Sequence, residues 1–250
     1  MARLVFLGTS NAVPDEKHEN THMILIGETR SVLIDCGPNP LVRLKSLELD
    51  CNSPSELLLT HFHPDHVGGV PSYLLSMWLQ GRTRELNIYA IEHTLDRLKA
   101  MMALYEWETW PEFYSVNFKE IALEEMALVF ENEEFRAFSS PVKHTIPNVG
   151  VRIELVDSGA AVVYSSDTEP CQAVVRLAKD ADMLIHESTG DELWHSSAAQ
   201  AGDIARQAGA KQLYLIHYTQ GKDTELLIAQ AEGAFDGPVF LAEDLMALNI

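Results

Sequence analysis

The sequence predicts an α/β fold in which two β-sheets pack face to face and helices cover their outer sides. Short apolar runs typical of buried strands are grouped in each half of the chain, and segments with helical periodicity are interspersed among them. Sheets and helices must bury their apolar faces against one another, so this grouping favours two packed layers of sheet. The 250 residues contain no repeat, low-complexity segment or Gly/Ser linker, and we expect a single domain over residues 1–250.

The strands of the first half are separated by turn signals such as Gly27 and the Gly37-Pro38 pair. A helix is expected over VPSYLLSMWLQ, and a longer helix is expected from about Thr94 to Glu106. The expected strands of this half cover residues 4–8, 22–27, 31–35, 56–60 and 86–91.

The second half begins with a run of strands and then alternates helices with strands. The expected helices cover residues 171–180, 197–209 and 224–235. The expected strands cover residues 116–121, 127–132, 134–140, 149–156, 160–166, 183–188, 212–218 and 238–243. The last of these, PVFLAE, is expected to be the final element of the chain.

The charge of the chain limits its partners. It carries 37 acidic and 18 basic side chains, a formal net charge of −19. Affinity for nucleic acids comes largely from Lys and Arg on phosphates, so this balance disfavours a large polyanion such as tRNA. Arg82 and Arg84, in LQGRTRELN, are expected to be ordinary charges of a surface loop.

The remaining composition points to a cytoplasmic protein without a membrane partner. No apolar run approaches the roughly 20 residues that span a bilayer. The N-terminal MARLVFLG is too short for a signal peptide. Cys36, Cys51 and Cys171 are few and scattered, which indicates neither a disulfide framework nor a zinc ribbon.

The segment THFHPDHVGG places four metal-ligand side chains, His61, His63, Asp65 and His66, directly after an apolar strand. In α/β proteins sites are built at the carboxyl ends of strands. Alternate residues of an extended segment point the same way, so His61 and His63 can face one ion, while Asp65 and His66 in the following turn can face a second. Imidazole and carboxylate are ligands of Zn²⁺ and similar metals. The two glycines that end the segment allow close backbone approach.

One such segment cannot complete a two-metal site, and further candidate ligands follow other strands. His144 follows the strand expected over residues 134–140, and Asp167 ends the strand AAVVYSS. His217 lies near the end of QLYLI. Each occupies the place where a strand end would deliver a ligand.

The HFHPDH run, with His144, Asp167 in SSDT and His217 in IHY, resembles the metallo-β-lactamase superfamily. The resemblance covers essentially the whole chain. It is greatest to the ribonuclease Z branch and its phosphodiesterase relatives, through FLGTSNAVP, IDCG, LQGRTRELNIY, IHES and HSSAAQ. The resemblance implies an αβ/βα four-layer sandwich of the metallo-β-lactamase type, with a two-metal site at its edge.

The same resemblance assigns the ligands. It implies a first metal on His61, His63 and His144, a second metal on Asp65, His66 and His217, and Asp167 bridging the two. The metals are expected to be Zn²⁺, with Mn²⁺ or Fe as alternatives.

The implied chemistry is hydrolysis by a metal-bridging hydroxide. Two divalent ions about 3.5–4 Å apart can lower the pKa of water and neutralise charge on a phosphoryl or carbonyl oxygen. Asp65 can also orient the nucleophile or accept its proton, and the resemblance places a functional histidine at His195, the candidate proton donor. The alternative for His195 is a helix-start residue. His186 and Glu187 end a strand, and one of them can orient His195 or a metal ligand, although a core histidine is an equal reading of His186.

Within this branch the sequence favours a phosphodiesterase that lacks the tRNA-gripping arm. Ribonuclease Z enzymes of the long-armed kind carry that arm between the third-motif histidine and the bridging aspartate, where this chain has only a hairpin. A small or single-stranded phosphodiester needs only the metals and one or two basic residues nearby, such as Lys143 or Arg152. The alternatives are a carbon-ester hydrolase (lactonase or thioesterase), a full tRNA 3′-end processing endonuclease, and a metal-binding protein without catalysis.

The aromatic segment YEWETWPEFY, residues 105–114, is open to several interpretations. It is more typical of a core or subunit contact than of a substrate box, and a hood over the site is an alternative. A homodimer is expected from the resemblance to the ribonuclease Z branch.

Overall fold

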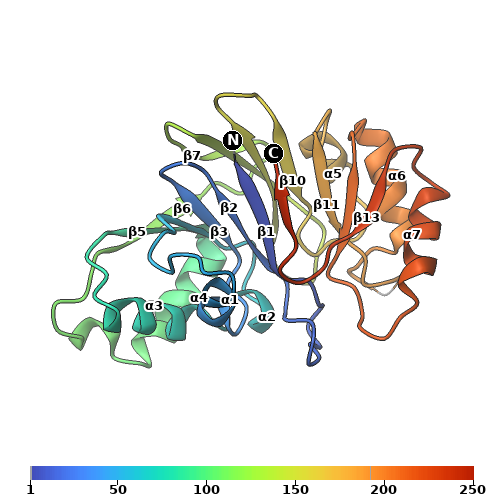
Figure 1. The fold of residues 1–250 in the computed structure, drawn as a ribbon. Coiled ribbons are helices and arrows are strands. Elements are labelled where there is room, and N and C mark those ends of the chain that lie inside the picture. The colour runs from blue at the N-terminus through green and yellow to red at the C-terminus, as the bar shows by residue number, and fades with distance from the viewer. Residues whose placement is uncertain (1, 192) are drawn as a thin grey trace.

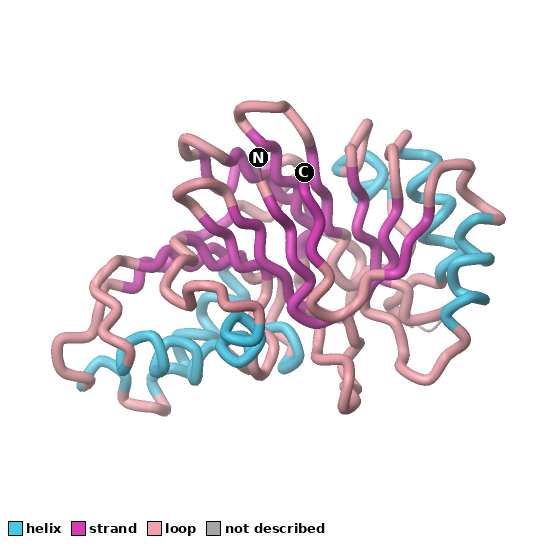
Figure 2. The backbone as a smooth tube through the Cα atoms, in the orientation of Figure 1, coloured by secondary structure: helices cyan, strands magenta, loops and turns pink. Residues whose placement is uncertain are grey.

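The computed structural model describes residues 2–191 and 193–250, and it consists of two seven-stranded sheets with helices on their outer sides (Figure 1). The first sheet has the strand order β14-β1-β2-β3-β4-β5-β6, and the second has the order β13-β12-β11-β10-β9-β8-β7. Figure 2 shows the strands gathered in the middle and the helices at the two flanks. This is the predicted arrangement of two sheets between layers of helix.

The first sheet and its helices come from the first half of the chain, plus one strand from the C-terminus. Its strands are β1 (Arg3–Gly8), β2 (His22–Ile26), β3 (Ser31–Ile34), β4 (Glu56–Leu58), β5 (Leu86–Ile91), β6 (Val116–Ile121) and β14 (Ala247–Asn249). Its helices are α1 (Pro40–Ser46), α2 (Pro64–Val67), α3 (Val70–Leu79), α4 (Glu92–Ala103) and the 3₁₀ turn η1 (Trp107–Thr109).

The second sheet comes entirely from the second half. Its strands are β7 (Ala127–Glu131), β8 (Phe135–Pro141), β9 (Val149–Leu155), β10 (Ala161–Tyr164), β11 (Met183–Glu187), β12 (Leu213–Ile216) and β13 (Val239–Leu241). Its helices are α5 (Gln172–Leu177), α6 (Ala198–Ala208) and α7 (Thr224–Glu232).

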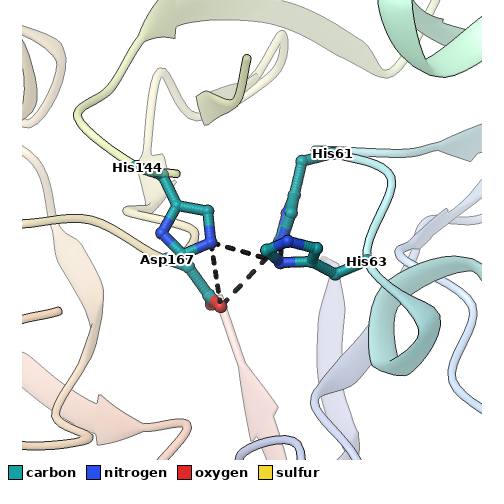
Figure 3. A group of neighbouring side chains, drawn as sticks. All are labelled: His61, His63, His144 and Asp167. Carbon is teal, nitrogen blue, oxygen red and sulfur yellow. Dashed lines mark hydrogen bonds and ion pairs between the residues drawn. The ribbon is translucent and has the colours of Figure 1, made fainter. Parts of the chain in front are cut away.

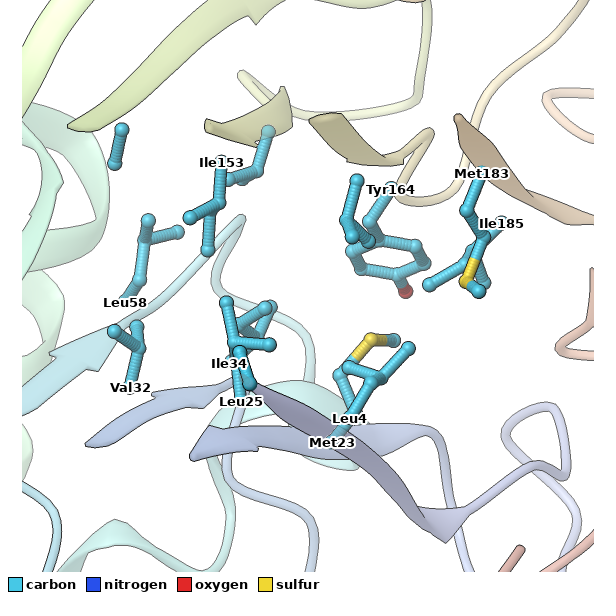
Figure 4. Packing of buried hydrophobic residues seen from close by; sticks show 14 of the residues in the cluster. Leu4, Met23, Leu25, Val32, Ile34, Leu58, Ile153, Tyr164, Met183 and Ile185 are labelled. Atoms are coloured by element: carbon cyan, nitrogen blue, oxygen red, sulfur yellow. The ribbon is translucent and has the colours of Figure 1, made fainter. Parts of the chain in front are cut away.

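The apolar strands are buried on both faces, and alternate residues serve different layers. Leu25 and Ile34 face the second sheet, where Ile153 lies opposite them, and Ile185 lies opposite Met23 and Leu4 (Figure 4). Their neighbour Leu33 points the other way, into the layer of α1, α3 and α4. Side chains on a strand alternate between its two faces, so a continuous apolar run is what a sheet covered on both sides requires.

Parallel strands bring several chain segments to one edge. Strands β3 to β6 run parallel in the first sheet, and β10 to β13 run parallel in the second. The segments that leave the carboxyl ends of β4, β10 and β12 carry His61, Asp167 and His217. The fold therefore delivers side chains that are distant in sequence to one place.

The predicted strands and the long helices are confirmed, and four short elements, α1, α2, η1 and β14, were missed. Helix α1 follows the turn at Gly37-Pro38, and α2 lies where we expected only a turn; both begin with proline at their first position, a residue suited to a helix start. The expectation that PVFLAE is the last element was wrong, because β14 follows and pairs antiparallel with β1. Such pairing between the two ends of a chain leaves no local signal.

The aromatic segment packs as part of the helical layer. The Trp110 ring stacks on Trp78 of α3, with 5.5 Å between ring centroids, and Trp107 meets Phe118 of β6 edge to face at 5.8 Å. Trp78 Nε1 donates to the carbonyl of Pro111 at 3.0 Å. These contacts bind the segment after α4 to α3 and β6.

Arg82 is not the surface charge that was expected. It is 4% exposed, and its guanidinium donates to the carbonyls of Asn52, Pro54, Arg84 and Glu85. A planar guanidinium with five donors can satisfy several loop carbonyls at once, so Arg82 joins two loops.

No helix in the described part of the chain is long and apolar enough to cross a membrane.

Candidate metal centre

The histidine-rich segment leaves β4 in an extended conformation and enters α2 at Pro64. His63 is the residue before the helix, with φ −99° and ψ 151°, and Asp65 and His66 lie in the helix itself. A backbone hydrogen bond stabilises this turn, because Cys36 N donates to the His66 carbonyl at 2.7 Å. A Cβ at Gly69 would lie 1.9 Å from the Gly37 carbonyl oxygen, so the predicted close backbone approach is confirmed.

A first group of side chains is formed by His61, His63, His144 and Asp167 (Figure 3). His63 Nδ1 lies 3.0 Å from His61 Nε2 and 3.2 Å from His144 Nε2. Asp167 Oδ2 lies 3.9 Å from His61 Nε2 and 4.0 Å from His144 Nε2. Three imidazole nitrogens and a carboxylate oxygen thus converge on one point.

A second group is formed by Asp65, His66, Asp167 and His217. Asp65 Oδ2 lies 3.5 Å from the Nε2 atoms of both His66 and His217. Asp167 Oδ1 lies 3.5 Å from His66 Nε2 and 3.4 Å from His217 Nε2. Asp167 therefore presents one oxygen to each group.

Both groups fit divalent cations. The buried atoms His66 Nε2 and Asp167 Oδ1 have no hydrogen-bond partner among the described residues. Buried polar atoms are almost always satisfied, so two such orphans facing each other indicate a missing ligand. Burial lowers the pKa of His61, His63 and His144, which favours the neutral imidazole that binds a metal.

The carboxylates of the centre are held ionised. Burial opposes ionisation of Asp167, but His217, His66 and His61 outweigh it and hold its pKa well below its usual value. Burial likewise opposes ionisation of Asp65, and His66 and His217 lower its pKa. Burial disfavours the charged form of His66, yet Asp167, Asp65 and Asp35 raise its pKa well above the ordinary value. A cation at the second group would therefore compete with a proton for His66.

Four of the histidines are oriented through the nitrogen that faces away from the centre. His66 Nδ1 lies 2.8 Å from Asp35 Oδ2, and His217 Nδ1 lies 2.9 Å from Thr189 Oγ1. The other two contacts are His61 Nδ1 to Thr60 Oγ1 at 3.1 Å and His144 Nδ1 to the Trp194 carbonyl at 3.0 Å. Such contacts select the tautomer that presents Nε2 to the centre.

Asp35 was missed as a functional residue by the sequence analysis, although IDCG was singled out. Its carboxylate is fully buried and also accepts from the Thr60 amide and hydroxyl, at 2.9 and 3.0 Å. The sequence did contain a pattern that could have identified Asp35, because this residue follows an apolar strand, as Asp167 and His217 do. Thr189 and the Trp194 carbonyl had no such signal.

Strand ends at the centre share an uncommon backbone conformation. Asp35 (φ 57°), Ser166 (φ 55°) and His217 (φ 55°) all adopt the left-handed region. This region is unfavourable for residues with a Cβ, and such strain clusters at functional sites. Asp35 and His217 directly follow β3 and β12, and Ser166 lies two residues after the end of β10.

His195 lies beside both groups. Its ring centroid is 5.3 Å from that of His144 and 5.7 Å from that of His217. His195 Nδ1 lies 3.0 Å from Glu187 Oε1, and this buried oxygen also accepts from the amides of Thr168 and Ser196. Glu187 therefore orients His195, which is one of the roles considered for it.

His186 lies outside the centre. It is fully buried, and its Nδ1 donates to the carbonyl of Glu187 at 2.8 Å. On strand β11 it points to the same side as Leu184, which packs against the outer helices, while Glu187 points to the side of Ile185. This geometry favours the interpretation of His186 as a core histidine.

Of the two bases expected near the substrate, only Lys143 is adjacent to the centre. It precedes His144 and forms an ion pair with Glu169. The prediction for Arg152 was wrong, because its guanidinium donates to the carbonyls of Leu177 and Lys179 at the end of α5. The segment between His144 and Asp167, all of which is described, is the β9–β10 hairpin and contains no arm.

Known proteins are similar to this chain over its whole length. Ribonuclease Z of Methanothermobacter thermautotrophicus is 29% identical, with 100% of this chain and 97% of that protein covered. Human tRNase Z, short form, has a TM-score of 0.80 at 26% identity, with 99% of each chain covered. The metallo-β-lactamase fold protein YhfI from Bacillus subtilis has a TM-score of 0.84 at 21% identity, covering 99% of this chain and 98% of that one.

These likenesses agree with the geometry, since the shared fold brings two clusters of His and Asp to one edge of the sandwich. The family profile of the anti-Pycsar protein Apyc1 matches residues 2–235. The chain therefore belongs to the family of the anti-Pycsar protein Apyc1, and it is a ribonuclease Z-like, metal-dependent hydrolase of the metallo-β-lactamase fold.

Proposed function

We propose that this protein is a phosphodiesterase that holds two divalent cations, most simply Zn²⁺, and acts on a small or single-stranded substrate. The position of Asp167 carries the proposal, because its two oxygens face two separate groups of ligand atoms. The proposed ligands are His61, His63 and His144 for the first cation, Asp65, His66 and His217 for the second, and Asp167 for both.

When bound, two such cations lower the pKa of water toward neutrality and neutralise charge on the phosphoryl oxygens. The protein's own groups then supply orientation and proton transfer. Asp65 Oδ2 lies at the second group, between His66 and His217, where a carboxylate can orient the attacking water or accept its proton. We propose that Asp65 orients the attacking water or accepts its proton, in addition to binding the metal.

His195 is the proposed proton donor for the leaving group. With Nδ1 held by Glu187, the ring presents Nε2 as the nitrogen that can deliver a proton. The carboxylate also stabilises the charged imidazole before that transfer, as a buried acceptor does in other His-carboxylate pairs. The ring lies within 6 Å of both His144 and His217, centroid to centroid, so it flanks both metal groups.

The surface supports a compact substrate. The net charge is −19, and a large polyanion would be repelled by it. The hairpin between β9 and β10 leaves no arm to grip a folded RNA in that described segment. Full tRNA 3′-end processing remains the second candidate because curated relatives are named Ribonuclease Z. Binding of tRNA at low salt that weakens steeply with added salt would support it.

The first experiment is hydrolysis of bis-p-nitrophenyl phosphate by the zinc-loaded protein, beside a panel of lactones and thioesters. The His61→Ala and Asp167→Ala proteins are the blanks, and Asp157→Ala, in the exposed β9–β10 turn, is the matched control. Phosphodiester turnover that both blanks lose and the control keeps is the expected result. Turnover of carbon esters alone would replace the proposal with a lactonase or thioesterase function.

We further propose a cytoplasmic homodimer, as expected from the sequence. Sedimentation at micromolar concentration tests the dimer, and a single species of about 27.9 kDa, the mass of one chain, would contradict it. Metal analysis of protein purified without added metal tests the assignment of zinc against Mn²⁺ and Fe.

A further inference from the structure

Three segments of the centre meet at Glu169, a residue to which no role has been given above. Its amide donates to the Lys143 carbonyl at 2.9 Å, beside His144. Its Oε2 pairs with the Lys143 ammonium group. Its Oε1 accepts from the amide of Trp194 at 3.2 Å. Glu169 thus joins the segment after β10 to the loops that carry His144 and His195.

Trp194 adopts a backbone conformation that is uncommon for a residue with a side chain. Its φ is 75°, in the left-handed region, where a Cβ meets the backbone and residues other than glycine are uncommon. In this conformation its amide points to Glu169 and its carbonyl accepts from His144 Nδ1 at 3.0 Å. The peptide groups on both sides of Trp194 are therefore engaged, one by an acid and one by a proposed metal ligand.

The conformation of Trp194 affects the orientation of both His144 and His195. The Trp194 carbonyl sets the tautomer of His144, so that Nε2 faces the first group. The next residue, His195, is carried to Glu187 by the same turn. If Trp194 relaxed to a negative φ, its carbonyl would swing away from His144 and the start of His195 would turn with it.

We infer that Glu169 is a positioning residue. By accepting from the Trp194 amide, it keeps Trp194 in the left-handed conformation and so aims the Trp194 carbonyl at His144. The inference rests on the proposed roles of His144 and His195. It assigns Glu169 no contact with substrate or metal.

The test compares Glu169→Ala with Glu169→Gln. The glutamine keeps a side-chain oxygen that can accept from the Trp194 amide but loses the charge. Glu125→Ala is the matched control, because Glu125 is an exposed acid that pairs with Arg176 away from these loops. Circular dichroism and thermal unfolding establish that each variant is folded.

The first readout needs no metal. The Nδ1–H proton of His144, identified by its loss in His144→Asn, gives a slowly exchanging NMR signal when it donates to the Trp194 carbonyl. We expect the signal in wild type, Glu169→Gln and Glu125→Ala, and its loss in Glu169→Ala. Retention of the signal in Glu169→Ala would overturn the inference.

The second readout is Zn²⁺ affinity, measured by competition with a chromophoric chelator. Loss of a contact that orients a metal histidine weakens metal binding about 10- to 100-fold, and we expect this for Glu169→Ala. Glu169→Gln should remain close to wild type. Equal loss in both variants would show that the charge of Glu169 acts on the cations, and the positioning role would be refuted.

A double variant covers the case in which Glu169→Ala does not fold. Glycine adopts a φ of 75° without strain, so adding Trp194→Gly should restore folding and the His144 signal. Failure of that restoration would count against the inference. Absence of phosphodiester turnover in wild type, with the NMR and affinity effects present, would refute the proposed function and leave the role of Glu169 intact.

Discussion

The histidines of this protein differ mainly in what contacts the nitrogen turned away from the centre. His66 contacts the Asp35 carboxylate and His195 contacts the Glu187 carboxylate, whereas His217 contacts a hydroxyl and His144 a backbone carbonyl. A carboxylate stabilises the charged imidazole, and a carbonyl or hydroxyl fixes a neutral tautomer. At His66 the carboxylate holds Nδ1 and leaves Nε2 facing the second group, as a proposed metal ligand requires. At His195 the carboxylate instead supports the proposed proton transfer.

A substitution at His195 should affect leaving groups unequally. A general acid contributes about 10²- to 10⁴-fold to a rate, but only when the leaving group needs a proton. In His195→Gln we expect kcat on a dinucleotide, whose leaving group is an alkoxide, to fall by about 10²-fold or more. On bis-p-nitrophenyl phosphate, whose leaving group is a stable anion, the loss should be far smaller. Equal losses on the two substrates would contradict the role of proton donor.

His22 should make the fold sensitive to acid. It is fully buried, and burial lowers its pKa to about 4 from the ordinary 6.5. Between these values the unfolded chain takes up a proton that the folded chain does not, so stability is full above pH 6.5 and falls as the pH drops toward 4. The shift corresponds to about 3 kcal/mol of unfolding free energy.

Urea unfolding of the metal-free protein at pH 7 and pH 4.5 measures this effect. In His22→Gln the difference between the two pH values should shrink, whereas Lys17→Gln, at an exposed site, should resemble wild type. An unchanged difference in His22→Gln would assign the acid sensitivity to other groups.

At the scale of elements, the C-terminal segment is fastened to the first half of the chain through Asp244. Its carboxylate accepts from the Thr9 hydroxyl at 2.7 Å, the Glu19 amide at 2.8 Å and Arg43 at 2.6 Å. The side chain of Asp244 is 7% exposed and that of Arg43 is 19% exposed. This contact joins the approach to β14 to β1, β2 and α1.

Asp244→Ala should therefore destabilise the protein. Both side chains are partly buried, so we expect a cost between that of a surface ion pair, under about 1 kcal/mol, and that of a fully buried pair, about 3–5 kcal/mol. Urea unfolding at pH 7 measures the change, and Asp236→Ala, at an exposed turn, is the control. A decrease in the free energy of unfolding of under about 1 kcal/mol, as for a surface ion pair, would show that Asp244 does not stabilise the packing of the C-terminal segment.

At the scale of the whole molecule, the candidate metal centre draws its side chains from both sheets. His61, His63, Asp65 and His66 follow β4 of the first sheet, whereas His144, Asp167 and His217 follow strands of the second. A cation bound between them would link two halves of the chain, in addition to their apolar packing and polar contacts such as the Arg30–Glu133 ion pair. Binding to the folded state alone stabilises that state by mass action.

Removal of metal should lower the melting temperature. A site at 100 times its Kd adds about 2.7 kcal/mol, and 1 kcal/mol shifts Tm by about 2–4 °C in a chain of this size. We expect a decrease of roughly 5–10 °C per site lost on chelation, measured by calorimetry. Asp167→Ala should show little response to the chelator, and an equal response in that variant would contradict the assignment of Asp167 to both cations.

The sequence by itself determined the two sheets and the proposed metal ligands. Apolar runs such as SVLID and ELLLT indicate strands because a sheet covered on both faces needs continuous apolar residues. His61, His63, Asp65 and His66 could be recognised because ligands of one centre lie at one strand end. These features depend on residues adjacent in the chain.

Only the tertiary structure decided which other groups contact them. Asp35, Thr189 and the Trp194 carbonyl orient His66, His217 and His144 across separations that no periodicity records. Burial of Arg82 and the pairing of β14 with β1 also join distant segments. A local pattern reports local conformation, whereas a side chain's hydrogen-bond partners depend on which strand ends the packing of two sheets brings together.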